Sequence, residues 1–295
     1  MQRRSSIHIS SLIVFLSILT TLLQFAVYYF FASSYLILGI SSLFVALCCH
    51  ILLERSYDYE ACFIYTVLSV FISLIVTILT YLGKDDSFSI IPYTETLIGI
   101  VVVNWLIPNI HCFIRNMFDY GTRIENYTEF YRNSSIIFLL FYIGIIVYGS
   151  FFVKVFPWAY PMNTDSVNLI PFLSVSTQIE DYLYGALPLS DILLYLSSRI
   201  LIFIPYGFYV TLISRRVSRL LRCVILLFVP VILEALQYFL YPTRCDIDDV
   251  IYAFFGGLLG ILCFSLTNAV YKLISGRNFL SKDPTYRFTN SSLHF

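Results

Sequence analysis

The sequence EALQYFLYPTRCDIDDVIYAFFGGLLG, residues 234–260, holds two apolar runs separated by a short polar turn. An acid and an amide, Glu234 and Gln237, lie within the first run. Three acids stand at the start of the second run: Asp246, Asp248 and Asp249. A charged side chain at the centre of a bilayer costs about 2.5–3.5 kcal/mol on insertion scales, so it needs a partner or a function. This stretch therefore predicts a polar site beside two membrane helices.

The composition of the whole chain supports a membrane protein. Hydrophobic residues make up 59% of the 295 residues and charged residues 12%, against about 45–50% and about 25% in soluble proteins. A membrane helix needs about 20 apolar residues, and the chain has such runs at 8–31, 34–53, 61–82, 96–114, 134–156, 189–213, 220–241 and 248–274. We predict an all-α, polytopic helical membrane bundle of about eight transmembrane helices. A four-helix region is expected at 1–133 and a second membrane region at 134–295.

The distribution of basic residues predicts the orientation of these helices. If the N-terminus is cytoplasmic, most of the 18 Lys and Arg residues fall on the inner side, as the positive-inside rule requires. Both termini are therefore expected in the cytoplasm. The turn at 241–247 and the long polar loop at 157–188 are then expected outside. Within that loop the apolar, proline-interrupted stretch 167–172 predicts a re-entrant or interfacial segment.

Helical spacing suggests which polar residues meet. Tyr195, Arg199 and Tyr206 are expected on one face of the run 189–213, because residues three, four and seven apart share a helix face. Arg199 is expected to reach Glu234 or Asp249 in a cavity open to the outer leaflet. Two interpretations stay open: an ion pair that only holds helices together, or a contact with a ligand.

Other polar residues have simpler explanations. Asp246 and Asp248 could cap the helix that follows them, and Gly256 and Gly260 have the spacing that allows close helix packing. The polar residues of the fourth run fit either a broken helix or amides satisfied by neighbouring helices: Asn104, Pro108, Asn109 and His111. A divalent cation on the acidic cluster is conceivable, but no further ligand is evident, so we predict no metal and no cofactor. No nucleophile is evident either, and no catalytic residue is predicted.

Four stretches in order resemble the VanZ-like family of bacterial membrane proteins, over about residues 134–274. They are Val167-Asn168-Leu169-Ile170-Pro171-Phe172, the run 200–208 (ILIFIPYGF), Glu234-x-x-Gln237, and Asp246-Ile247-Asp248-Asp249-Val250-Ile251 with Gly256-Gly257. The family usually has asparagine where this chain has Arg199 and Ala253. An arginine often precedes the first motif where this chain has Asp165 and Ser166. The departures imply a polar site with a different charge arrangement.

The resemblance implies a multi-pass protein of the bacterial cell membrane that contributes to resistance to lipoglycopeptide antibiotics, teicoplanin more than vancomycin. The expected function is to bind or shield an amphipathic ligand at the outer leaflet. Expected partners are membrane lipids and a lipid-linked cell-wall precursor or lipoglycopeptide, and no nucleic acid. The alternatives are a lipid or small-molecule transporter or flippase, and a membrane enzyme acting on a lipid-linked substrate. The candidate ligand contacts are Arg199, Glu234, Gln237, Asp246, Asp248, Asp249 and, from the first motif, Asn168.

Overall fold

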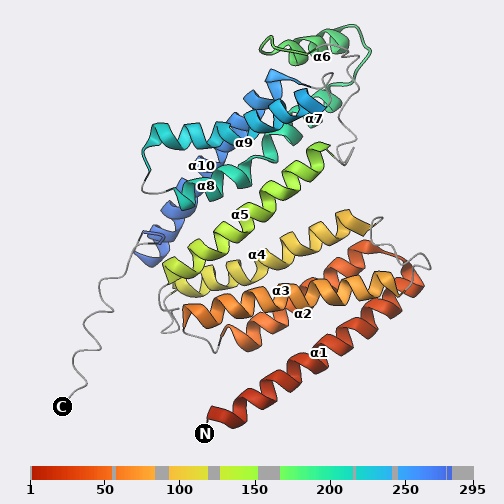
Figure 1. Cartoon of the computed structure of the whole chain (residues 1–295), viewed down its shortest axis with the longest axis vertical. Helices are drawn as coiled ribbons and strands as arrows, with labels where there is room; N and C mark the ends of the chain where they lie inside the picture. The colour runs from red at the N-terminus through yellow and green to blue at the C-terminus, as the bar shows by residue number, and fades with distance from the viewer. Residues whose placement is uncertain are drawn as a thin grey trace, which may run out of the picture. The chain divides into compact units, whose positions relative to one another are not determined.

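The computed structural model describes residues 2–54, 58–83, 93–118, 127–151, 167–214, 217–240, 245–276 and 278–280 (Figure 1). Within these ranges the regular structure is α-helical, apart from one isolated β-bridge between Asn168 and Asp246. The helices are α1 (Gln2–Phe31), α2 (Ser34–Leu52), α3 (Tyr59–Leu82), α4 (Thr94–Phe118), α5 (Tyr127–Phe151), α6 (Leu173–Leu183), α7 (Leu189–Leu201), α8 (Ile204–Ile213), α9 (Arg219–Leu240) and α10 (Ile247–Ser275).

Eight segments of the described chain are long and apolar enough to cross a membrane, with α7 and α8 together forming one of them. The prediction of an all-α membrane bundle with about eight spans is confirmed. The cytoplasmic location of both termini stays a prediction.

The structure differs from the predicted segments in three places. The helix expected at 134–156 begins at Tyr127, because the side chains of Tyr127, Phe130 and Tyr131 are buried at helical spacing within a polar-looking stretch. The predicted loop 157–188 contains the helix α6. The bounds of the predicted span 189–213 are confirmed, but within it a turn at Ile202 and Phe203 separates α7 from α8. Pro205 lies in the first turn of α8 and has no N–H to continue the hydrogen bonding of α7.

Packing divides the chain into two compact units. Unit 1 comprises Met1–Ser134 with Tyr271–Phe295, and unit 2 comprises Ser135–Val270. The predicted division of the chain into two membrane regions, 1–133 and 134–295, stays a prediction.

In unit 1, helices α1 to α4 pack against one another (Figure 1) and bury neutral polar side chains between them. Asn104 is fully buried and donates to Ser41 Oγ at 2.7 Å and Ser73 Oγ at 2.8 Å. Gln24 of α1 accepts a hydrogen bond from Thr80 at 3.1 Å. Helix α4 runs without a break through Pro108. The broken-helix interpretation of the fourth run is therefore wrong, and neighbouring hydroxyls satisfy the Asn104 amide.

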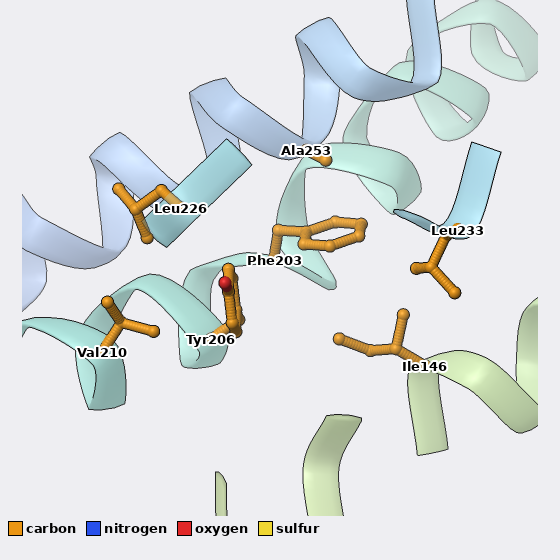
Figure 2. Packing of buried hydrophobic residues seen from close by; sticks show 7 residues of the cluster. All are labelled: Ile146, Phe203, Tyr206, Val210, Leu226, Leu233 and Ala253. Atoms are coloured by element: carbon orange, nitrogen blue, oxygen red, sulfur yellow. The ribbon is translucent and has the colours of Figure 1, made fainter. Parts of the chain in front are cut away.

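In unit 2, an apolar core joins α5, α8, α9, α10 and the interruption between α7 and α8 (Figure 2). Its buried residues are Ile146, Phe203, Tyr206, Val210, Leu226, Leu233 and Ala253. Phe203, at the interruption itself, points into this core beside Tyr206 (Figure 2). Figure 2 also shows that Ala253, where the family usually has asparagine, lies at an apolar position.

Glycines bring the backbones of unit 2 into contact. A Cβ atom on Gly207 would overlap the backbone of Gly257, and one on Gly256 would overlap the backbone of Ile200. Gly260 has the same relation to the backbone of Ile204. The predicted packing role of Gly256 and Gly260 is confirmed, and it holds α10 directly against α7 and α8.

Candidate functional site

The polar residues of unit 2 meet where α10 begins. The bridge between Asn168 and Asp246 places the segment before α6 beside the first residues of α10. The Asn168 N–H donates to the Cys245 carbonyl, and the Ile247 N–H donates to the Asn168 carbonyl, both at 3.0 Å. Two stretches separated by more than 70 residues thus form one polar cluster, which comprises Asn168, Ser174, Asp246 and Asp248.

Asp246 holds this polar cluster together. Its carboxylate accepts hydrogen bonds from Asn168 Nδ2 at 2.8 Å and Ser174 Oγ at 2.5 Å. It also accepts the backbone N–H of Asp248 at 2.9 Å, which is the bond that an N-cap residue makes to a helix. Asp246 therefore caps α10 and fixes the segment before α6. The capping interpretation accounts for its position.

Asp248 caps a different helix. Its side chain is 0% exposed and accepts the N–H groups of Phe172 at 2.5 Å and Ser174 at 2.9 Å. These are donors at the start of α6, which has no side-chain cap of its own. Phe172 has a φ of 63°, a left-handed conformation that is uncommon for a residue other than glycine. The Asp248 carboxylate stabilises this start of α6.

Glu234 of α9 contacts the same region through the residue that precedes α10. It is 9% exposed, and its carboxylate accepts the backbone N–H of Asp246 at 2.9 Å. Burial, together with the neighbouring carboxylates of Glu234 and Asp246, raises the pKa of the Cys245 thiol. Gln237, one turn further along α9, is half-buried. The backbone of Gln237 belongs to the hydrogen-bonded helix α9, and its side chain makes no hydrogen bond to another described residue.

Arg199 and Asp249 form a partly exposed ion pair beside the polar cluster. Arg199 of α7 makes an ion pair with Asp249, and their side chains are 29% and 26% exposed. The guanidinium also lies over the Tyr195 ring, with Cζ 4.5 Å from its centroid, a geometry that favours a cation. Tyr195 is buried and meets Tyr252 edge to face at 6.5 Å between centroids. The predicted pairing of Arg199 is thus with Asp249.

The structure separates the predicted site residues into two groups. Asn168, Asp246, Asp248 and Glu234 satisfy one another or nearby backbone groups, and Arg199 and Asp249 form a partly exposed pair. The predicted alignment of Tyr206 with Arg199 on one helix is wrong, because Tyr206 belongs to α8 and donates to the Ile225 carbonyl at 2.6 Å. Ser174 was missed, since the sequence signals no helix there. Whether any of these residues contacts a ligand stays a prediction.

Part of the predicted charge rearrangement cannot be placed. Asp165 and Ser166 lie outside the described residues. Among the residues that the structure does describe, no group of three or more His, Cys, Asp and Glu side chains is arranged to hold a metal ion.

The comparisons with known proteins agree with the motifs. Residues 137–268 match the family model described as VanZ/LLP1. The matched segment contains every residue of the polar cluster together with Arg199, Glu234 and Asp249. The resemblance to VanZ-like proteins is confirmed over this segment. No curated protein matches the chain, and no solved structure matches it.

Proposed function

We propose that this membrane protein, whose residues 137–268 match the VanZ/LLP1 family, binds or shields an amphipathic ligand at the outer leaflet of a bacterial membrane. The ligand is a lipid-linked cell-wall precursor or a lipoglycopeptide, and the outcome is reduced sensitivity to teicoplanin. The observation that carries the proposal is the Arg199–Asp249 ion pair, which lies within two membrane-spanning segments and stays more than one quarter exposed.

The pair is suited to recognition because each residue can give up its ion-pair partner and bind a ligand group instead. Arg199 offers a planar set of N–H donors that fits a phosphate or carboxylate, and Asp249 offers an acceptor for an amide, hydroxyl or amine. The Tyr195 ring fixes the guanidinium from one side. An ion pair that only holds helices together needs no exposure. Asp248, which accepts backbone N–H groups and is fully buried, is an example of an acid in such a role.

The test is the minimum inhibitory concentration of teicoplanin and vancomycin in a susceptible Gram-positive host that expresses the protein. The variants are Arg199→Gln and Asp249→Asn, and the matched control is Asp191→Asn, an exposed acid in the first turn of α7. All proteins are compared at equal abundance in the membrane. We expect a rise for teicoplanin that exceeds the rise for vancomycin, retained in Asp191→Asn and lost in both site variants.

Two results would contradict this proposal. A host with unchanged sensitivity would remove the resistance role. A rise that survives both site variants would show that the Arg199–Asp249 pair takes no part in it.

One observation favours transport as a second candidate function. The span that carries Arg199 is interrupted at Ile202 and Phe203, and discontinuous helices mark the binding sites of many secondary transporters. Purified protein in sealed vesicles that contain a fluorescent lipid would separate the two functions. Transport predicts movement of the lipid between leaflets, whereas binding or shielding predicts none.

A further inference from the structure

The surface helix α6 distributes its residues in the reverse of the order found in water-soluble proteins. Its two buried residues, Ser174 and Gln178, are polar. Its exposed residues include Ile179 at 46%, Tyr182 at 43% and Leu183 at 73%. A water-soluble surface helix buries its apolar stripe and exposes its polar one. The reversed order predicts that the apolar stripe of α6 is covered by something other than this chain.

Helical geometry resolves α6 into three faces, since successive residues are about 100° apart around the axis. Ser174 and Gln178 mark the face against the protein. Val175, Ile179, Tyr182 and Leu183 form a second, apolar face. Ser176, Thr177 and Glu180 form a third, exposed face, which is polar apart from Leu173 at the first residue of the helix. A helix that contacts protein, lipid and water at once needs three such faces.

The ends of α6 determine where it lies. Asp248, in the first turn of the spanning helix α10, holds the N–H groups of Phe172 and Ser174. At the other end, α6 stops at Leu183 and the next spanning segment begins at Leu189. Both ends are thus tied to the ends of membrane spans, and Figure 1 shows α6 at the end of unit 2 where α10 begins. This places α6 at the level of the membrane surface.

We propose that α6 is an interfacial helix whose apolar face lies among the lipids at that membrane surface, with Ser176, Thr177 and Glu180 facing water. The lipid partner is zwitterionic or neutral, because residues 167–198 contain Glu180, Asp181 and Asp191 but no Lys or Arg. Interfacial helices that bind anionic lipids carry Lys and Arg on their polar face. Burial of apolar side chains therefore drives the contact. The proposal holds whatever unit 2 binds.

Tryptophan fluorescence in reconstituted vesicles tests the placement. The chain has two tryptophans, Trp105 and Trp158. A variant with both replaced by phenylalanine has no tryptophan fluorescence and serves as the parent protein. Single tryptophans are then placed on the apolar face, by Ile179→Trp and Leu183→Trp, and on the polar face, by Thr177→Trp and Glu180→Trp. Circular dichroism and gel filtration select the variants that keep the fold.

In vesicles of phosphatidylcholine brominated near the headgroup, we expect strong quenching of Ile179→Trp and Leu183→Trp, because the apolar face of an interfacial helix lies about 5–10 Å deep at the headgroup–acyl boundary. Thr177→Trp and Glu180→Trp should be insensitive to these bromines and quenched by aqueous iodide. Added phosphatidylserine should leave this pattern unchanged.

Three results would overturn the proposal. Iodide quenching of all four tryptophans would show that α6 is fully in water. Quenching of all four by brominated lipid would show that the helix is immersed. Protection of Ile179→Trp and Leu183→Trp from both quenchers would show that protein, such as a second copy of the chain, covers the apolar face.

Discussion

Units 1 and 2 both bury polar side chains between membrane helices, but they use different chemistry. Unit 1 joins α1 to α4 with neutral amides and hydroxyls, such as Asn104 with Ser41 and Ser73. Unit 2 uses carboxylates, with Asp248 and Glu234 buried and Asp249 paired to Arg199. A neutral network adds specificity to packing at low cost, whereas a buried carboxylate needs hydrogen-bond donors to offset the loss of water around it. Unit 2, which gathers the buried carboxylates, is therefore where a function is expected.

Within unit 2, two neighbouring acids repeat the same contrast on a smaller scale. Asp248 is fully buried and accepts two backbone N–H groups of another helix. Asp249 is partly exposed and pairs with a side chain that can leave it. Neighbouring residues on a helix point about 100° apart, so the sequence DD carries one structural acid and one candidate ligand contact.

The largest expected effect separates these two acids. Asp248→Ala should destabilise the start of α6 by about 3 kcal/mol or more, because two hydrogen bonds to a charged acceptor are lost and the Ser174 N–H stays buried without its acceptor. Asp249→Ala should cost about 1 kcal/mol or less, as for a partly exposed ion pair. Hydrogen exchange of the Phe172 and Ser174 amides measures both. Equal protection of these amides from exchange in the two variants would show that Asp248 and Asp249 do not differ in their structural role.

A smaller effect is expected at the glycines, which differ between the units. Gly207→Ala in unit 2 should lower stability by about 1–3 kcal/mol, since the added methyl group overlaps the backbone of Gly257 and the helices must separate. Gly39→Ala in unit 1 meets nothing within 4 Å and should be neutral or stabilise α2 by up to about 1 kcal/mol. Thermal unfolding in detergent compares them. The close contact of α8 and α10 would be disproved by a Gly207→Ala protein as stable as the Gly39→Ala protein.

The smallest expected effect concerns the neutral network of unit 1. Asn104→Ala removes hydrogen bonds to Ser41, Ser73 and Ser42. Interhelical hydrogen bonds in membranes average about 0.6 kcal/mol each, so the loss should be about 1–2 kcal/mol in thermal unfolding. Ser42→Ala, which removes one of these bonds, should lose correspondingly less. A loss as large as that of Asp248→Ala would mean that charge makes no difference between the units.

The sequence predicts the membrane class and most span boundaries because apolar length is a local property. It fails at α6, where alternating small, polar and apolar residues look like a loop. Only the burial of Ser174 and Gln178 in the structure reveals that this stretch is a helix packed on the rest of unit 2. It fails also at Ile202 and Phe203, because the apolar composition continues through the turn there. The N–H groups of both residues still donate to carbonyls of α7, and Pro205 is the residue that lacks an N–H to extend the helix.

The sequence by itself determined that Arg199, Glu234 and the three acids near 246–249 need partners, since an isolated charge in a membrane is too costly to be left alone. Only the tertiary structure decided which partner each one has. Asn168 and Ser174 reach Asp246 across more than 70 residues of chain, and Arg199 pairs with Asp249, while Glu234 takes the Asp246 N–H. Pairing depends on how helices distant in sequence pack, and no local pattern of residues specifies that.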